Sequence, residues 1–239
     1  MSVVDVRDLT IRYGEITAVR HLDLRVEAGE VVGLLGGNGA GKSSTLRAIA
    51  GVNPPSSGTL IVAGHDLADD RQVDAARQAV GYCPDVGGLL RQATVREHIG
   101  LALAFRRKTQ QWPRALDLLE RFGLSASLDR ITTGFSHGMC RRLSVLLAVL
   151  TAEQVLVLDE PFDGVDPLGV EAALDMIGIA RRDGLGVLVS THLLPVLAGG
   201  CDRIVVMAAG AVVDAGEGAT FAGTEGLRRY TSTLQLEAP

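Results

Sequence analysis

Residues 36–43 read GGNGAGKS, and this stretch constrains the chain more than any other part of its sequence. It fits the pattern G-x-x-x-x-G-K-[ST]. The apolar run at residues 31–35 precedes it, and Leu46, Ile49 and Ala50 follow at helical spacing. A strand, a glycine-rich loop and a helix in this order are the structural context that the pattern requires. The chain is therefore expected to contain an α/β unit built around this loop.

The residue types of the loop suit the binding of a triphosphate. Glycines let successive backbone N–H groups point inward, where side chains would block the phosphates. Lys42 can reach the β- and γ-phosphates, the Ser43 hydroxyl can ligate Mg²⁺, and the helix N-terminus adds positive partial charge. The predicted ligand residues are Gly36, Gly37, Asn38, Gly39, Ala40, Gly41, Lys42, Ser43 and Ser44. A glycine-rich turn with a chance lysine is the alternative, and the flanking strand and helix disfavour it.

Lysine is rare in this chain, which makes its presence in the loop informative. Lys42 and Lys108 are the two lysines, against 21 arginines. A compact ammonium suits a phosphate loop better than a planar guanidinium does. The choice of lysine here therefore supports a phosphate-binding role independently of the glycine pattern.

Length and composition narrow the class of protein. With 239 residues, 47% of them hydrophobic, the chain can bury a sizeable core. The net charge is −5 and the arginines are scattered, so nucleic acid is not an expected partner. The longest apolar runs, 145–150 and 204–213, are shorter than the roughly eighteen residues that span a bilayer, and the N-terminus lacks a secretory pattern. The three cysteines are far apart and are predicted to be reduced cytosolic thiols.

The first 28 residues predict an antiparallel sheet with one solvent-exposed face, because apolar and polar positions alternate in short runs. Tyr13-Gly14 interrupts this pattern. An aromatic residue at a strand end ahead of a phosphate loop can stack on a nucleotide base, and a half-buried strand tyrosine is an equal alternative. Further short strands are predicted at residues 59–63 and 80–85, the second ending at a proline and a glycine-containing loop.

The chain becomes helical between residues 87 and 152. Thr94 and Glu97 form a capping box that predicts a helix start, and a second helix is expected from about Trp112 to Phe122. A third helix is expected to begin after Ser136, a preferred N-cap residue. Taken as structure alone, FSHGM at residues 135–139 is a helix start, although its free N–H groups can also bind an anion in the same or another chain. These helices predict an all-helical insertion into an α/β chain.

Two buried strands are predicted to bring polar residues to one edge of a parallel sheet. The apolar run at 155–158 precedes Asp159 and Glu160, and the run at 186–190 precedes His192. Asp159 is placed to hold Mg²⁺ and Glu160 to polarise an attacking water. The structural alternatives are that Asp159 and Glu160 are surface acids at a strand end, and that His192 is only the polar end of its strand. A phosphate-binding loop in the same chain favours the functional interpretation.

The remainder of the chain is predicted to be scaffold. Asp166-Pro167 indicates another helix start, with aspartate as the cap and proline in the first helical position. Residues 203–207 and 211–215 resemble a hairpin. No chemistry is predicted after residue 216.

In this order the motifs resemble those of the nucleotide-binding subunit of ATP-binding cassette (ABC) transporters, over about residues 3–215. By this resemblance Tyr13 is the aromatic that stacks on adenine, residues 36–44 are the Walker A loop, and residues 80–85 lead into the Q-loop. Residues 136–139 are the signature motif, and Asp159 is the Walker B aspartate. The resemblance further implies that Glu160 is the catalytic carboxylate, Asp166 the D-loop residue and His192 the switch histidine.

The resemblance implies an ATPase that uses ATP and Mg²⁺. Its catalytic residues are Lys42, Glu160 and His192, and its metal contacts are Ser43, Asp159 and Asp85. Ser136, Gly138 and Asp166 join the loop residues and Tyr13 in binding nucleotide. The implied fold is α/β: a P-loop NTPase core with a mixed sheet, an N-terminal antiparallel β-subdomain and an inserted α-helical subdomain. Residues 1–86 and 153–239 form the core and residues 87–152 the helical part of one domain.

The resemblance also implies partners. Two such subunits, identical or different, associate head to tail so that each ATP lies between the Walker motifs of one and the signature of the other. Closure on ATP drives a separate integral-membrane permease, which places the chain in the cytoplasm on the inner face of the membrane. GYCP followed by TVREH, and a signature followed by RRL, are most similar to the drug and lipid exporters of the daunorubicin-resistance and ABC-A type.

Two residues depart from the family pattern. Asp85 occupies the position of the Q-loop glutamine, and an ionised carboxylate cannot donate a hydrogen bond. His137 occupies the position of the first signature glycine. A soluble ABC ATPase and a weakly hydrolysing ATP sensor are the competing functions. The single cassette, short helical insertion and negative charge oppose the first. Glu160 and His192 oppose the second.

Overall fold

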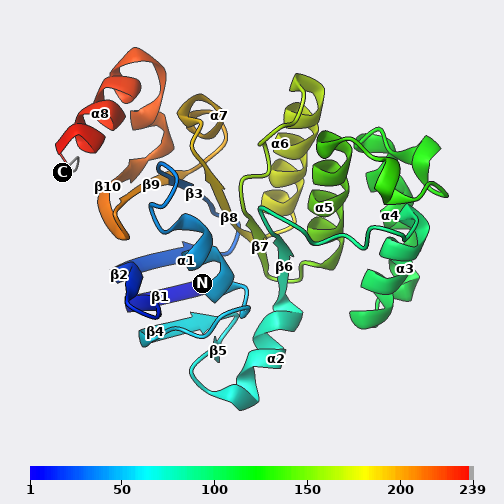
Figure 1. Cartoon of the computed structure of the whole chain (residues 1–239), viewed down its shortest axis with the longest axis horizontal. Coiled ribbons are helices and arrows are strands. Elements are labelled where there is room, and N and C mark those ends of the chain that lie inside the picture. Colours follow the sequence, from blue (N-terminus) through cyan, green and yellow to red (C-terminus); the bar gives the residue numbers. More distant parts are fainter. Residues whose placement is uncertain (237–239) are drawn as a thin grey trace.

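Two β-sheets and a group of helices make up the fold (Figure 1). The computed structural model describes residues 1–236. The smaller sheet has the strand order β2-β1-β4-β5 and the larger one β10-β9-β3-β8-β7-β6. The strands of the smaller sheet are β1 (Ser2–Tyr13), β2 (Ile16–Glu27), β4 (Ser57–Val62) and β5 (His65–Asp66). Those of the larger sheet are β3 (Val31–Leu35), β6 (Val80–Cys83), β7 (Val155–Leu158), β8 (Gly186–Thr191), β9 (Arg203–Ala208) and β10 (Ala211–Glu217).

The smaller sheet is antiparallel throughout, as the sequence predicts. In β1, Val4 pairs with Val26 of β2 on one side and with Val62 of β4 on the other. All three of these valines are buried. The turn after β1 contains Gly14 at φ +57°, a backbone conformation that glycine adopts without strain.

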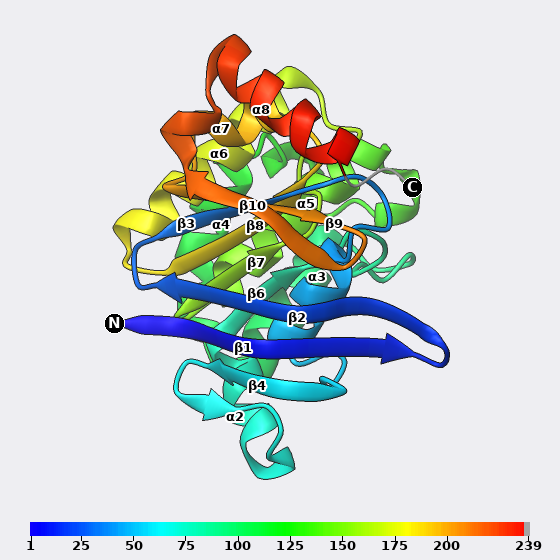
Figure 2. The ribbon, with the colours of Figure 1, turned by 90° about the vertical axis from the view of Figure 1, so that its left-hand side faces the viewer.

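The larger sheet is mixed. Strands β3, β6, β7, β8 and β9 run parallel, and β10 pairs antiparallel with β9. Both faces are covered, so alternate residues of β3 enter different cores: Val32 and Leu34 pack with the N-terminal sheet and helix α1 (Lys42–Ile49), whereas Val31 and Leu35 pack with the helices on the other face. Figure 2 shows the two sheets one above the other, from β10 to β4. Burial on both faces explains the apolar runs that predict parallel strands.

The helices capped by Thr94, Ser136 and Asp166 begin where the sequence predicts, because their signals are local. The Thr94 side chain accepts a hydrogen bond from the Glu97 backbone N–H. The Glu97 side chain accepts one from the Thr94 backbone N–H, which completes the capping box. Ser136 caps its helix by accepting from the Met139 backbone N–H, and Asp166 caps its helix by accepting from the Gly169 backbone N–H. The helices after α1 are α2 (Asp70–Ala79), α3 (Val95–Phe105), α4 (Trp112–Arg121), α5 (His137–Thr151), α6 (Pro167–Arg182), α7 (Leu194–Ala198) and α8 (Gly223–Leu236).

Helix α5 connects the helical part of the chain to the larger sheet. It contacts α3 and α4 on one side and β6 and β7 on the other. In Figure 1 it stands between the sheet and the helices α3 and α4. The predicted antiparallel sheet, mixed core sheet and helical insertion are therefore confirmed, while the boundary at residues 87 and 152 stays a prediction.

None of the helices described between residues 1 and 236 is long and apolar enough to cross a membrane. Helices α2, α7 and α8 have no counterpart in the sequence-based expectation.

Candidate active site

The glycine-rich loop connects β3 to α1, and its glycines are required for different reasons. A side chain at Gly36 would overlap the backbone carbonyl of Met207 in β9. Gly41 has φ +101°, and a Cβ there would lie 2.6 Å from the carbonyl oxygen of Ala18. Gly39 has φ +81°. Packing against neighbouring strands and left-handed backbone geometry thus both restrict the loop to glycine at these positions.

Lys42 is buried and turns back over this loop. Its Nζ donates to the carbonyl oxygens of Gly36 at 2.7 Å and of Gly37 at 3.2 Å, and it lies 3.2 Å from Oε1 of Glu160. These three acceptors match the three donors of an ammonium group. The arrangement holds a positive charge beside the N-terminus of α1.

Asp159 directly follows β7 and lies at the centre of a buried hydrogen-bond network. Its Oδ1 accepts from Ser43 at 3.0 Å and from Ser190 at 2.7 Å, while Ser190 Oγ accepts from the Glu160 backbone N–H at 3.0 Å. Burial raises the pKa of Asp159. Its Oδ2 is buried and has no hydrogen-bond partner among the described residues. A buried carboxylate with a free oxygen suits a bound cation.

The oxygen ligands offered by Asp159 and Ser43 are of the type that a magnesium ion prefers. Mg²⁺ in nucleotide sites is held by one or two carboxylates together with phosphate oxygens and water. Asp159 and Ser43 supply one carboxylate and one hydroxyl. Among residues 1–236 no group of three His, Cys, Asp or Glu side chains could hold a metal ion.

Glu160 adopts φ +48°, a conformation that costs a non-glycine residue about 1–2 kcal/mol. The Ser190 hydroxyl accepts from its backbone N–H and helps to hold this geometry. The carboxylate lies between two partners, with Lys42 on Oε1 and the His192 Nδ1 atom 3.1 Å from Oε2. Glu160 is buried, whereas His192 is partly exposed. The strand ends of β7 and β8 therefore bring the predicted acid and histidine together.

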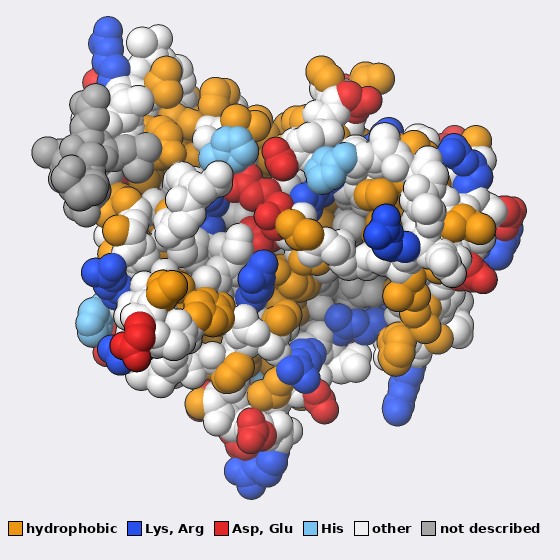
Figure 3. Space-filling model, viewed as in Figure 1, with side chains coloured by type: hydrophobic (Ala, Val, Ile, Leu, Met, Phe, Trp, Pro, Cys, Tyr) orange, Lys and Arg blue, Asp and Glu red, His pale blue; other side chains and the backbone are white. Residues whose placement is uncertain are grey.

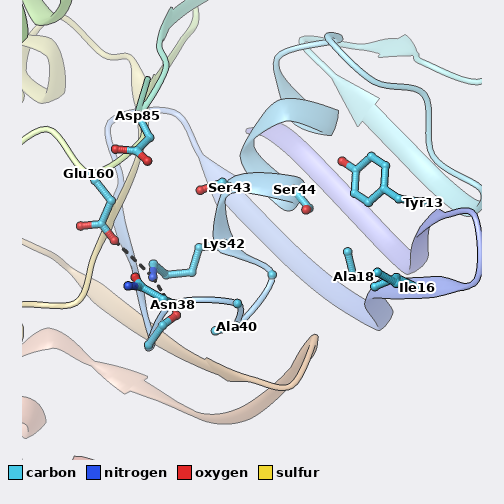
Figure 4. Close-up of a pocket in the computed structure, with 13 residues that line it drawn as sticks. Tyr13, Ile16, Ala18, Asn38, Ala40, Lys42, Ser43, Ser44, Asp85 and Glu160 are labelled. Carbon is cyan, nitrogen blue, oxygen red and sulfur yellow. Dashed lines mark hydrogen bonds and ion pairs between the residues drawn. The ribbon is translucent and has the colours of Figure 1, made fainter. Parts of the chain in front are cut away.

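A pocket of about 410 Å³ runs along the loop, within the size range of ligand sites. Figure 4 shows Tyr13 at one end, Asp85 and Glu160 at the other, and Lys42, Ser43 and Ser44 between them. The lining residues are Tyr13, Ile16, Ala18, residues 37–44, Asp85 and Glu160. Ile16 and Ala18 of β2 were not expected from the sequence.

Tyr13 is 42% exposed and its hydroxyl accepts from Asn53 Nδ2 at 3.1 Å. Tyr13 lines the pocket from the N-terminal sheet, and stacking on adenine stays a prediction. Asp85 enters the same pocket from the loop after β6, where its Oδ1 lies 3.2 Å from Nη2 of Arg141. The sequence reasoning missed Arg141 and Ser190, because their partners lie far away in the chain.

The signature residues lie apart from this pocket. Ser136 caps α5 by accepting from the Met139 backbone N–H, and neither it nor Gly138 lines the pocket. The His137 ring packs against Gly164, where a Cβ would collide with it. Asp166 accepts from the Gly169 backbone N–H at 2.8 Å. Nucleotide contacts by these residues stay predictions.

The face that carries these elements is shown in Figure 3, where acidic and histidine side chains gather at its centre. Blue basic groups are visible beside the acidic ones. The region thus combines opposite charges in one hollow, as a site for a polyanion and a cation requires.

Comparison with known proteins places these features in a family. The sequence profile of the ABC transporter family matches residues 19–163. The methionine import ATP-binding protein MetN of Geobacillus kaustophilus is 35% identical over 209 residues, which cover 85% of this chain and 61% of MetN. The lipopolysaccharide export system ATP-binding protein LptB of Haemophilus influenzae is 31% identical over 219 residues, which cover 90% of this chain and 91% of LptB. ATP-binding cassette sub-family A member 7 of Rattus norvegicus is 37% identical over 213 residues, which cover 87% of this chain and 10% of that protein.

Solved structures agree. An ATP-binding subunit of an ABC transporter superimposes with a TM-score of 0.83 at 31% identity, covering 97% of this chain and 94% of that one. A dimeric bacterial ABC transporter cassette superimposes with a TM-score of 0.83 at 24% identity, and the match covers 90% of this chain and 98% of that one. At this identity the similarity shows only that the two chains share a fold. Relatives named for import and for export both occur, so the subgroup expected from the sequence is not resolved. Because the profile match covers more than half of the chain and LptB aligns over most of its length, the chain belongs to the ABC transporter family and is an ATP-binding subunit, an ATPase that energises transport.

Proposed function

We propose that ATP binds in the pocket along the glycine-rich loop, with its adenine on Tyr13 and its phosphates on residues 37–44. The observation that carries this proposal is the placement of Lys42, Glu160 and His192 in one contiguous chain of contacts at the carboxyl edge of the larger sheet. An anion at this edge meets the N-terminus of α1 and the Lys42 ammonium, both of which favour negative charge.

The residues around the pocket have different roles in hydrolysis, according to where each one lies. Glu160 accepts hydrogen bonds and is placed to orient and polarise a water for attack on the γ-phosphate. His192 contacts the Glu160 carboxylate and holds its direction. When ATP enters, Lys42 exchanges carbonyl partners in the loop for phosphate oxygens, which neutralises charge on the transferring group. Mg²⁺ held by Ser43 and Asp159 supplies further neutralisation of phosphate charge when it is bound.

A nucleotide-binding test separates these roles from general folding. Lys42→Ala is expected to lower ATP affinity, because the ammonium contacts the phosphates directly. Lys108→Ala is a matched control, since Lys108 pairs with Glu153 away from the pocket. Equal affinity in the two variants would contradict the assignment of the pocket.

We further propose that two subunits share each ATP. The support is that Ser136 and Gly138 begin a helix whose N–H groups are suited to an anion, yet they do not line the pocket of their own chain. A second subunit, identical or different, then supplies them. The dimeric cassette with the same fold is consistent with this arrangement.

Mixing two inactive variants tests the shared site. Lys42→Ala damages the pocket, and Ser136→Arg blocks the exposed helix start with a bulky side chain. If the site is shared, mixed dimers contain one intact site, and random mixing restores at most about a quarter of the parental rate. If both parts act within one chain, mixing restores nothing. Thermal unfolding of each variant confirms that it folds.

The transported molecule and its direction belong to the membrane partner. We propose export of a drug or a lipid by a separate permease, with this subunit on the cytoplasmic face of the membrane. The support is the motif similarity noted above and the match to sub-family A member 7. Co-purification of a multispanning protein, followed by ATP-driven transport in vesicles reconstituted from both proteins, tests this. ATP-driven uptake in the import direction would contradict it.

A further inference from the structure

Arg141 is buried in α5 and joins three segments of the chain. Its Nη1 donates to the carbonyl oxygen of Pro84 at 2.8 Å and lies 3.4 Å from that of Asp159, while Nη2 donates to the carbonyl oxygen of Asp85. Only 4% of its side chain is exposed. The guanidinium therefore fastens α5 to the loop after β6 and to the end of β7, next to the pocket.

The same guanidinium pairs with a carboxylate. Asp85 Oδ1 lies 3.2 Å from Arg141 Nη2, and the Asp85 side chain is 36% exposed. Asp85 borders the pocket together with Glu160, so two carboxylates line the region that receives the phosphates. An unpaired carboxylate there would repel a triphosphate. A guanidinium in contact with the carboxylate opposes this repulsion.

Helix α5 also connects this pair to the position where the signature departs from the family pattern. His137 and Arg141 are four residues apart and thus lie on the same face of the helix. Both border a small cavity of about 160 Å³, together with Asp85. The start of α5 is therefore joined to the edge of the pocket through one buried side chain.

We propose that Arg141 is a positioning residue of the ATP site, which fixes the segment at Pro84 and Asp85 and neutralises the Asp85 carboxylate. Asp85 is then the partner of Arg141 and not a ligand of the metal ion. This inference rests on the proposed ATP site.

A role in charge compensation differs from a purely structural one in a way that can be measured. If Arg141 only ties backbone carbonyls together, its loss harms the protein whatever residue occupies position 85. If it also neutralises Asp85, removing that carboxylate compensates for the loss of the guanidinium. Asparagine keeps the size of aspartate and one acceptor oxygen, so Asp85→Asn removes the charge alone.

The experiment measures equilibrium binding of a fluorescent ATP analogue, first in EDTA and then across a Mg²⁺ titration, with thermal unfolding as the folding control. The variants are Arg141→Gln, Asp85→Asn and the double variant. Arg142→Gln is the control, because Arg142 lies on the same helix and donates instead to the Phe122 carbonyl oxygen.

Arg141→Gln is expected to weaken binding in EDTA by about tenfold, within the range for contacting pairs. The double variant should return to within about threefold of Asp85→Asn, in line with the same coupling. The control should bind as the parent does, and the half-saturating Mg²⁺ concentration should be unchanged by Asp85→Asn.

Three results would overturn the inference: equal weakening in Arg141→Gln and the double variant, no weakening in Arg141→Gln, or a higher Mg²⁺ requirement in Asp85→Asn. A parent protein that does not bind the analogue would instead contradict the proposed ATP site, so the two failures are distinguishable.

Discussion

Gly36 stands where the carbonyl group of Met207 leaves no room for a side chain, whereas a Cβ at Gly37 would meet no atom within 4 Å. Met207 cannot retreat easily, because it pairs with Val212 in β10. Gly36→Ala therefore overpacks the loop against β9. Overpacking of this kind costs about 1–3 kcal/mol, and for a domain of this size each kcal/mol lowers Tm by about 2–4 °C. The expected loss is about 2–12 °C.

Gly37→Ala should differ from Gly36→Ala in both thermal stability and ATP affinity. Its backbone is not in the left-handed region, so Tm should stay the same or rise slightly. Gly37 lines the pocket and Gly36 does not, so the added methyl in Gly37→Ala should interfere with phosphate binding. Loss of about one charge-assisted hydrogen bond, about 1.5–3 kcal/mol, weakens ATP binding by about 10-fold to 150-fold.

The assay for this pair is calorimetric unfolding of the nucleotide-free proteins, together with equilibrium ATP binding at a temperature at which both are folded. Gly36→Ala should lose stability, and Gly37→Ala should lose ATP affinity. Equal Tm values for Gly36→Ala and Gly37→Ala would refute the structural explanation of the loop.

Three further predictions concern residues around the site. Ser190→Ala removes a hydrogen bond to the buried Asp159 carboxylate, so it should lower stability by about 1.5–3 kcal/mol, which denaturant unfolding measures against the exposed control Ser125→Ala. If His137 tunes hydrolysis through its contact with Gly164, His137→Gly should change the ATPase rate. Gly164→Ala should then lower Tm more in the parent than in His137→Gly, and an unchanged rate or equal losses would contradict this. Burial raises the pKa of Cys83 to about 11 from an ordinary value near 9, so its thiol favours the folded state up to about pH 9 and this stability is lost as the pH rises toward 11. Alkylation at pH 8 should therefore leave Cys83 unmodified until the protein unfolds, as mass spectrometry of the labelled peptides would show.

Much of the fold was predictable because its signals are local. The capping residues Thr94, Ser136 and Asp166 lie within four residues of the groups that they bond, and each begins a helix as expected. The apolar runs of β3, β7 and β8 are equally local, since burial on both faces removes polar residues from the strand itself.

The missed helices carry weaker apolar signals, although α2 is preceded by a capping aspartate, Asp69. In α2 only Ala76 and Ala79 are buried, so no apolar periodicity indicates a helix. Helix α7 has five residues, too few to show a period. Helix α8 was not anticipated either.

The site was predicted where residues share a motif and missed where long-range contacts define the role. Lys42, Asp159, Glu160 and His192 stand in recognisable patterns at strand ends. Arg141 is an ordinary charged residue of a helix until the structure brings Pro84, 57 positions away, to its side chain. Ser190 is likewise one polar residue at the end of an apolar strand until Asp159 contacts it. A single sequence does not show such pairs.

The central claim is that Glu160 directs water at the γ-phosphate of an ATP bound in this pocket. Glu160→Gln tests it most directly, because the amide keeps the size of the side chain while it lacks the basicity of a carboxylate. The measurement is the ATPase rate of the purified subunit with its partners, alongside ATP affinity. Glu160→Gln should bind ATP as the parent does and hydrolyse it about 100-fold or more slowly, the scale of general base catalysis. A variant that binds ATP as the parent does and hydrolyses it no more slowly would contradict the role of Glu160 in directing the attacking water.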